Sequence, residues 1–327
     1  MLTIAQCTDS FLPVSDGVGR ISYAYARELA GRGHELYVVT PMVNGFYRGR
    51  HPFEILDYMG VRMPGQQKGQ LGMANLDLHY LARADSLRFD VVHTHSPGSA
   101  GMEAVRLSSR LHVPLVGSFH PQYFEEYLNT RGDEKSAALS VHFILDYFNR
   151  CDEIWTVSEE ARALLLEHGF SGRVEIMENG TQRYGLSPAG DGAVRAHFHL
   201  GEEPLLLYVG RIDRVKNVLP LLDTAALLAA GGAPFTLIFA GQGPDEETLR
   251  ARAHALGLQK HVRFSGPVED DSLLYGLYAA ASLCLFPALN VSPGLVVREA
   301  AALGTPSLVL EGSTAAGFIR DGENGLV

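Results

Sequence analysis

The sequence contains few cysteines and no long apolar segment. Cys7, Cys151 and Cys284 lie far apart in a chain of 327 residues, and they form neither a Cys-x-x-Cys pair nor an even disulfide set. We therefore expect a reducing, cytoplasmic compartment. No apolar run approaches the ~18 residues of a membrane-spanning helix, and residues 1–9 lack the basic leader of a signal peptide. These absences predict a cytoplasmic protein and leave open peripheral contact with the inner face of a membrane.

Positive charge is also scarce. The chain has 27 Lys and Arg against 37 Asp and Glu, a net charge of -10, and acidic residues outnumber basic ones both before and after residue 200. A basic nucleic-acid-binding module is therefore not expected, and we predict no nucleic-acid partner. Hydrophobic residues make up 46% and charged residues 20%, values that exclude disorder as the main state.

Several motifs that bind nucleotides or metals are missing. The chain has no Gly-x-x-x-x-Gly-Lys-Ser/Thr loop and no Gly-x-Ser-x-Gly elbow, which argues against P-loop NTPases and α/β-hydrolases. No Asp-x-Asp pair occurs, so the usual carboxylate clamp for a metal–nucleotide complex is absent. His93 and His95 alternate like two ligands on a strand, but no further ligand follows at metal-binding spacing. We therefore expect no metal and no cofactor.

Short β-branched runs alternate with longer helical patterns along the whole chain. This alternation predicts parallel sheets with helices on both faces. Strands are expected at 2–7, 35–40, 53–58, 91–95, 114–118, 153–157 and 174–177, and later at 205–209, 236–240, 262–264, 283–286 and 307–310. Helices are expected at 21–32, 99–109, 137–148 and 159–168, and later at 218–230, 246–256, 272–281 and 295–303.

The pattern stops at the Gly- and Pro-rich segment 184–192 and then starts again. We predict two doubly wound, Rossmann-like domains, 1–184 and 193–327, facing an interdomain cleft. In such sheets ligands bind beyond the carboxyl ends of the strands. The segment 321–325 leads toward a further strand just before the chain ends at Val327, so the second domain is expected to be truncated by at least one strand and one helix.

Two cations bracket a short loop in the second domain. Arg211 and Lys216 lie in the segment 209–217, between a predicted strand and a predicted helix. Cations at a helix start oppose the helix dipole, which favours a functional reason for them over simple surface exposure. Together they could hold a diphosphate and neutralise charge that develops on a leaving group.

Weaker signals accompany this loop. Gly17 lies in a glycine-containing turn after the first strand, and Gly241-Gln242-Gly243 ends a strand of the second domain. Such turns let backbone N–H groups approach an anion, although each is also explained as an ordinary connection. Glu299 sits in an otherwise apolar helix, where a carboxylate needs a partner such as a ribose diol or a neighbouring arginine. His120 ends a strand and is either a sugar contact or a structural histidine, whereas the single tryptophan, Trp155, is expected in the core.

Taken in order, these segments resemble the retaining glycosyltransferases of family 4, which have the two-domain GT-B fold. Single matches are weak, but the ordered set is specific and covers essentially the whole chain. The segments are Asp16-Gly17-Val18, Gly33-His34-Glu35, Phe119-His120, Thr156-Val157-Ser158, Glu178-Asn179-Gly180-Thr181, Gly210-Arg211 with Lys216, Gly241-x-Gly243, Glu299-Ala300 and Gly304-Thr305-Pro306.

The resemblance implies a metal-independent hexosyltransferase with an acceptor-binding first domain and a nucleotide-sugar-binding second domain. It implies that Arg211 and Lys216 hold the diphosphate of a UDP- or GDP-sugar and that His120 faces the donor sugar, these three being the catalytic residues. The further donor contacts that it implies are the backbone at Gly17, Gly294 and Leu295, the side chain of Glu299 on the ribose, and the turn 266–268 beside the base.

The acceptor implied by the resemblance is the hydroxyl of a lipid or a glycan, and the segment 123–127 is similar to that of lipid-glycosylating members. One position departs from the family. Members usually carry an acidic residue eight positions before Glu299, and here Val291 stands there after Asn290. Two alternatives therefore remain open: a nucleotide-sugar-binding protein with weak or no transfer activity, and a sugar-nucleotide epimerase.

Overall fold

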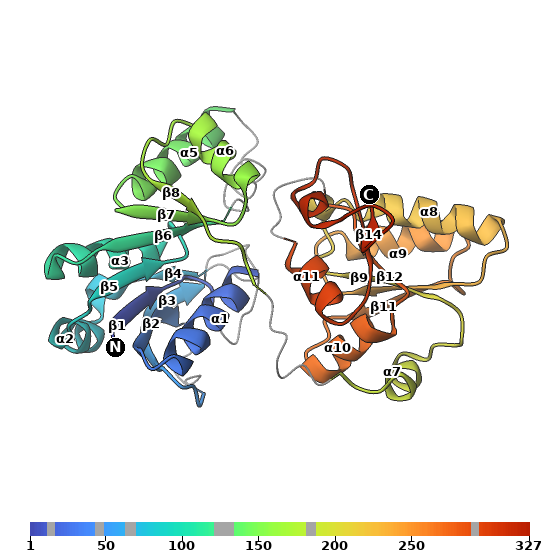
Figure 1. Ribbon diagram of the computed structural model, residues 1–327, viewed down its shortest axis with the longest axis horizontal. Helices are drawn as coiled ribbons and strands as arrows, with labels where there is room; N and C mark the ends of the chain where they lie inside the picture. The colour runs from blue at the N-terminus through green and yellow to red at the C-terminus, as the bar shows by residue number, and fades with distance from the viewer. Residues whose placement is uncertain (12–16, 43–48, 63–69, 121–133, 181–187, 289–293) are drawn as a thin grey trace. The chain divides into compact units, whose positions relative to one another are not determined.

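The computed structural model describes residues 1–11, 17–42, 49–62, 70–120, 134–180, 188–288 and 294–327. The chain divides into two compact units, Met1–Asn179 and Gly180–Val327. Each unit contains one sheet of mostly parallel strands with helices packed against it (Figure 1). The prediction of two α/β parallel-sheet units is confirmed.

The sheet of the N-terminal unit has eight strands in the order β4-β3-β2-β1-β5-β6-β7-β8. Neighbouring strands run parallel, except that β4 is antiparallel to β3. The chain leaves β1 toward β2 on one side and returns to β5 on the other, so the loops after β1 and β5 diverge at one edge of the sheet. The strands are β1 (Thr3–Cys7), β2 (Glu35–Met42), β3 (Glu54–Arg62), β4 (Gln70–Gly72), β5 (Val91–Thr94), β6 (Leu115–Phe119), β7 (Glu153–Thr156) and β8 (Val174–Ile176).

Both faces of this sheet are covered. In β1, Ala5 and Cys7 join a buried cluster with residues of α2 and α3, whereas Ile4 packs on the opposite face with residues of α1. Because successive side chains of a strand point to opposite faces, apolar residues at consecutive positions require helices on both sides. The helical segments are α1 (Gly17–Gly31), η1 (Ala74–Leu76), α2 (Leu78–Ser86), α3 (Ser99–Leu111), α5 (Glu134–Phe148) and α6 (Glu159–Glu167).

The sheet of the C-terminal unit has six parallel strands in the order β11-β10-β9-β12-β13-β14. From β9 the chain adds β10 and β11 on one side of the sheet and then β12 to β14 on the other side. The loop after β9 and the helix after β12 therefore follow adjacent strands. The strands are β9 (Leu205–Val209), β10 (Thr236–Ala240), β11 (Val262–Gly266), β12 (Leu283–Phe286), β13 (Ser307–Val309) and β14 (Gly325–Leu326).

Two buried clusters again cover the two faces. Leu237 and Phe239 of β10 pack with residues of α8 and α9, whereas Ile238 and Ala240 pack with residues of α7, α10 and α11. The helical segments are α7 (Asp191–Phe198), η2 (Arg214–Lys216), α8 (Leu219–Ala230), α9 (Glu246–Ala255), α10 (Asp271–Ala280), α11 (Leu295–Ala302) and η3 (Thr314–Phe318).

The structure adds elements that periodicity does not predict. Helix α2 forms because the Asp77 carboxylate caps it, accepting from the backbone N–H of Tyr80 at 3.0 Å and, with its other oxygen, from that of Met59 at 3.0 Å. Helix α7 begins at Asp191, inside the segment 184–192 that we interpret as a linker, and only Val194 of this helix is buried. Its four apolar residues, Ala193, Val194, Ala196 and Phe198, do not complete the i, i+3, i+4, i+7 pattern of an amphipathic helix, which is why the sequence pattern misses it.

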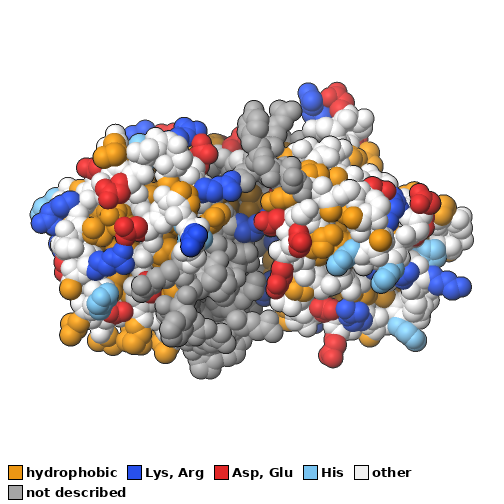
Figure 2. Space-filling model, turned by 90° about the horizontal axis from the view of Figure 1, so that it is seen from below, with side chains coloured by type: hydrophobic (Ala, Val, Ile, Leu, Met, Phe, Trp, Pro, Cys, Tyr) orange, Lys and Arg blue, Asp and Glu red, His pale blue; other side chains and the backbone are white. Residues whose placement is uncertain are grey.

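Charged side chains are mixed on the surface. On the face drawn in Figure 2, Lys and Arg are interspersed with Asp and Glu over both units. Several pair within one helix, as Arg162 does with Glu159 at 3.4 Å and Arg250 with Glu246 at 2.8 Å. Such exposed pairs contribute little to stability. Within the described ranges, no helix is both long and apolar enough to cross a lipid bilayer.

Candidate active site

In the N-terminal unit, the loops after β1 and β5 are joined by the carboxylate of Asp9. One carboxylate oxygen accepts from the Ser96 hydroxyl at 2.7 Å, and the other accepts from the backbone N–H of Ala100 at 2.9 Å and from the Ser99 hydroxyl. Burial raises the pKa of Asp9, and these hydrogen bonds oppose that shift. A carboxylate at the N-terminus of α3 also lies at the positive end of the helix dipole. Asp9 therefore fixes the two loops to each other.

Three buried histidines lie at the same edge of the sheet. His93 is in β5, His95 follows it, and His120 follows β6. The Gln6 side-chain amide donates to the carbonyl oxygen of Ser22 at 2.8 Å and lies 2.9 Å from Nε2 of His95. Nδ1 of His95 lies 3.4 Å from Nε2 of His120. The predicted site residue His120 is thus one end of a buried polar chain.

Two of these histidines are neutral near pH 7. Burial, and to a lesser degree the neighbouring His120, lower the pKa of His93 to about 3. Burial also lowers the pKa of His95 well below its ordinary value, with His93 and His120 acting in the same direction. A neutral imidazole has one N–H donor and one acceptor nitrogen. These two rings therefore act through hydrogen bonds rather than through charge.

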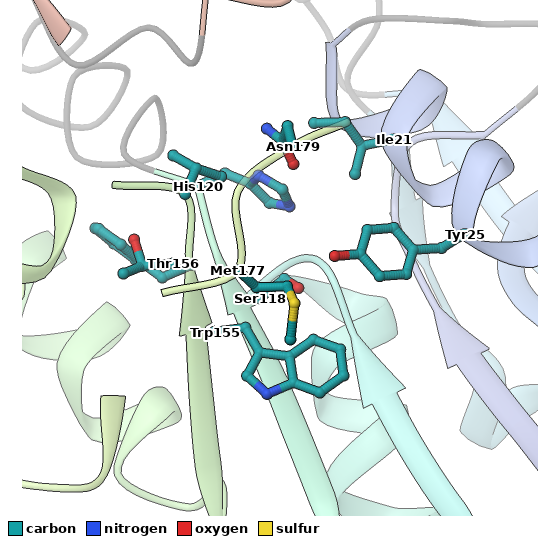
Figure 3. A pocket seen from close by; sticks show the side chains of 10 residues that line it. Ile21, Tyr25, Ser118, His120, Trp155, Thr156, Met177 and Asn179 are labelled. Carbon is teal, nitrogen blue, oxygen red and sulfur yellow. The ribbon is translucent and has the colours of Figure 1, made fainter. Parts of the chain in front are cut away.

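A small pocket opens beside His120, beyond the carboxyl ends of β6, β7 and β8. Figure 3 shows the imidazole of His120 and the hydroxyl end of Tyr25 pointing into it from opposite sides, with Asn179 above and Trp155 below. Helix α1 contributes Tyr25 and Ile21 to the wall. This is the position at which open α/β sheets bind ligands.

The prediction that Trp155 belongs to the core is wrong. Its side chain is half-buried, its ring lines the pocket, and its Nε1 donates to a carboxylate oxygen of Glu153 at 2.6 Å. The preceding residue, Ile154, is the one that enters the core cluster. Since side chains alternate along β7, Trp155 must face the other way.

In the C-terminal unit, Arg211 and Lys216 occupy one loop at the carboxyl end of β9. The Arg211 guanidinium pairs through Nε with Oδ2 of Asp213 at 2.8 Å and remains 60% exposed. The other oxygen of Asp213 accepts from the backbone N–H of Lys216 at 2.9 Å, so Asp213 caps η2. The Tyr208 hydroxyl donates to the carbonyl oxygen of Arg211 at 2.6 Å. Asp213, which periodicity and charge do not single out, therefore organises both predicted cations.

The cap at Asp213 gives a direct prediction. Asp213→Ala removes both the acceptor for Lys216 and the partner of Arg211, and we expect it to lower the free energy of unfolding by about 1–2 kcal/mol. Asp213→Asn keeps a capping oxygen, and we expect it to lower the free energy of unfolding by only a few tenths of a kcal/mol. Denaturant unfolding followed by far-UV circular dichroism measures the difference. Equal losses for the two variants would contradict a capping role.

Gly241 and Gly243 lie against this loop rather than in an open turn. A Cβ atom on Gly241 would lie 1.9 Å from the carbonyl oxygen of Gly210, and one on Gly243 would lie 2.0 Å from that of Ile212. The backbone N–H of Ile212 also donates to the carbonyl oxygen of Gln242 at 3.0 Å. Both positions require glycine because the backbone of the Arg211 loop passes too close to leave room for a Cβ atom. This close packing supports the loop that carries Arg211.

Glu299 lies in α11, the helix that follows β12. One of its carboxylate oxygens accepts from the Tyr278 hydroxyl at 2.8 Å, and Tyr278 is buried in α10. The half-buried carboxylate thus has a partner of a kind that the sequence does not indicate. Gly294 is the N-cap of α11 with φ +59°, a left-handed conformation that favours glycine, and Leu295 is the first residue of the helix. Helix α11 follows β12, which is adjacent to β9 in the sheet.

Gly17 is the first residue of α1, so the helix starts four residues earlier than the periodicity predicts. Other predicted features lie outside the described residues: the departure at Asn290 and Val291, and the segment 123–127. Within the described part of the chain, His93 and His95 belong to no cluster of three or more His, Cys, Asp or Glu side chains suited to a metal ion.

Two parallel, doubly wound units in one chain, each with polar side chains at the carboxyl ends of its strands, are the architecture of GT-B enzymes. The fold of HepE from Anabaena, solved in complex with UDP-glucose, is similar, with a TM-score of 0.73 at 18% identity over 100% of this chain and 85% of that one.

Family models assign the chain more closely. The model of Glycosyltransferase Family 4 matches residues 15–182, and that of Glycosyl transferases group 1 matches residues 193–327. The chain belongs to glycosyltransferase family 4, and it is a glycosyltransferase. It is 30% identical to D-inositol 3-phosphate glycosyltransferase of Thermomonospora curvata, over 92% of this chain and 76% of that protein. It is 23% identical to alpha-monoglucosyldiacylglycerol synthase of Streptococcus pneumoniae, over 93% of this chain and 70% of that protein.

Proposed function

We propose that this enzyme transfers a sugar, with retention of configuration and without a metal ion, from a UDP- or GDP-sugar to a hydroxyl group of a lipid or glycan. The names of two relatives support a lipid or inositol phosphate acceptor. The complex of HepE with UDP-glucose supports a nucleotide-sugar donor. The missing Asp-x-Asp motif favours a donor site that relies on protein cations.

The arrangement of Arg211 and Lys216 carries this proposal. Cleavage of the bond between the sugar and the nucleotide leaves negative charge on a diphosphate. Asp213 occupies Nε of Arg211, which directs one edge of the guanidinium and leaves its terminal nitrogens for an anion. The capped turn η2 places Lys216 on the same loop. Two fixed cations stabilise the leaving group where its charge develops.

The remaining predicted residues complete the donor site in this proposal. Glu299 accepts hydrogen bonds from the ribose, and the backbone at Gly17, Gly294 and Leu295 contacts phosphate or sugar oxygens. His120 faces the donor sugar. The acceptor hydroxyl attacks from the face that the diphosphate leaves, and a departing phosphate oxygen takes its proton. Exclusion of water protects the donor from hydrolysis.

The proposed acceptor places the enzyme at the cytoplasmic side of a membrane when that acceptor is a lipid. A peripheral contact is sufficient for this, since only the hydroxyl of the headgroup has to reach the N-terminal unit. The segment 123–127, whose resemblance favours a lipid, lies outside the described residues.

A thermal-shift screen tests the donor site. We expect one UDP- or GDP-sugar to raise the melting temperature by about 5–10 °C at a concentration about 100-fold above its Kd, because the ligand binds only the native state. Arg211→Ala and Lys216→Ala should each abolish this shift while the far-UV spectrum stays native. Arg214→Ala removes a cation of the same turn and is the matched control, for which the shift should persist.

The screen also separates the alternatives. An undiminished shift in both alanine variants removes the two cations from the donor site. With the identified donor, product analysis then distinguishes transfer to an added acceptor from binding without turnover and from isomerisation of the donor sugar. The last two outcomes would follow if Val291, in place of the usual acidic residue, had removed transfer activity.

A further inference from the structure

A buried series of side-chain hydrogen bonds runs from Gln6 through His95 to His120, and it determines which nitrogen of His120 carries the proton. The orientation of the Gln6 amide is settled by Ser22, because the carbonyl oxygen of Ser22, 2.8 Å away, accepts only from a donor. The nitrogen of that amide therefore also faces Nε2 of His95, at 2.9 Å. An N–H directed at Nε2 requires this atom to be an acceptor.

The proton of His95 then sits on Nδ1. His95 is fully buried and its pKa lies well below the ordinary value, so its ring is neutral and holds one proton. Nδ1 lies 3.4 Å from Nε2 of His120, the ring centroids are 5.7 Å apart, and the ring planes differ by 18°. Two rings that are nearly coplanar and edge to edge direct an N–H of one along the lone pair of the other. Nε2 of His120 is therefore an acceptor as well.

We propose that Gln6 and His95 are positioning residues that hold His120 in the tautomer with its proton on Nδ1. This inference rests on the proposed role of His120 at the donor sugar. The chain makes the Nδ1 edge of His120 a hydrogen-bond donor, suited to a sugar hydroxyl or ring oxygen and unsuited to the removal of a proton. In free histidine the Nε2–H tautomer predominates, so the protein selects the less common form.

Aromatic side chains pack around the hydrogen-bonded side chains of Gln6, His95 and His120 and limit their movement. Tyr25 packs edge-on against both His93 and His95, with ring centroids 5.6 Å apart in each pair. Trp155 packs against His93 at 4.9 Å. Gln6 is in β1 and His95 follows β5, two neighbouring strands, so the sheet itself sets their separation. Buried hydrogen bonds in such a setting are strong enough to select one tautomer.

Nitrogen-15 spectra of histidine-labelled protein test the proposal without any substrate. Long-range proton–nitrogen correlations distinguish protonated from unprotonated ring nitrogens, and His120→Gln assigns the signals of His120 by their loss. In the native protein at pH 7.5 we expect Nδ1 of both His95 and His120 to be protonated and Nε2 to be unprotonated. A His120 ring with its proton on Nε2 would overturn the proposal, whatever the donor or the activity.

Three variants separate positioning from packing. His95→Phe fills the space but removes the donor, so His120 should shift toward the Nε2–H form and kcat should fall by about tenfold or more, with KM for the donor within about twofold. His95→Asn restores a donor near the position of Nδ1 and should recover part of kcat and the native His120 spectrum. His93→Phe, a buried histidine outside the chain, should leave the His120 nitrogens unchanged. Loss of kcat in His95→Phe with an unaltered His120 spectrum would also refute the proposal. If instead the native protein shows the Nδ1–H form of His120 but transfers no sugar, only the proposed function is contradicted.

Discussion

Gly241→Ala should destabilise the C-terminal unit by about 3–5 kcal/mol, a loss that few single substitutions reach. The backbone at Gly241 has φ +155°, and an added Cβ would lie 1.9 Å from the carbonyl oxygen of Gly210. The obstructing atom belongs to the backbone and not to the end of a flexible side chain, so the loop before Arg211 must move. We therefore also expect the variant to lose the thermal shift caused by the donor.

Gly232→Ala is the matched control for this result. Gly232 has φ +73°, and nothing lies within 4 Å of a Cβ built there. The control thus carries the cost of a left-handed conformation, about 1–2 kcal/mol, without the collision. Far-UV circular dichroism in denaturant measures both variants. Equal destabilisation would show that the collision with Gly210 is relieved at no cost and that Gly241 does not support the Arg211 loop.

The strands and helices follow from local patterns, which explains why the fold can be predicted from the sequence. Both sheets are buried on two faces, so their strands are continuous apolar runs, and the helices between them are long enough to show a period. Helix α2 has a local signal that periodicity alone overlooks, namely the capping residue Asp77. The two-residue strand β14 is too short to show alternation, and only the turn-like segment 321–325 before it indicates a strand there.

The candidate site is only partly predictable for a different reason. His120, Arg211 and Lys216 end strands or open helices, and such positions can be identified from sequence. The residues that contact them cannot be identified from sequence when the contact joins distant segments. Gln6 and His95 are 89 residues apart and Tyr278 and Glu299 are 21 apart, and in both cases the pairing depends on strand order and helix packing. Asp213 is the exception, since a capping residue three positions before Lys216 is visible as a local pattern.

Acid should destabilise the N-terminal unit through its buried histidines. In the unfolded chain His93 and His95 titrate near pH 6.5, whereas burial holds the pKa of His93 in the folded protein at about 3 and that of His95 well below its ordinary value. Below pH 6.5 the unfolded chain therefore binds more protons, and stability falls as the pH falls. At pH 5.0 the loss should be about 2 kcal/mol for each histidine, or about 4 kcal/mol in all, relative to pH 7.5.

Shifted pKa values of two other described groups modify this dependence. His51 is partly buried, which lowers its pKa and adds a small loss of the same sign. Asp9 acts in the opposite direction, because burial raises its pKa and the folded state then binds its proton more tightly as the pH falls. The histidines dominate between pH 7.5 and 5.0, since the unfolded chain takes up their protons there first.

Trp155, the one tryptophan of the sequence, lies 4.9 Å from the His93 ring and reports unfolding of this unit by fluorescence. Denaturant unfolding at pH 7.5 and 5.0 measures the stability difference. His93→Phe removes one of the two buried titrating groups and should lose about half of the pH dependence. His79→Gln, an exposed histidine on α2, should retain all of it. A native protein that is equally stable at both pH values would mean that the histidine cluster takes up protons while folded, and the hydrogen bonds that join Gln6, His95 and His120 could then not depend on neutral rings.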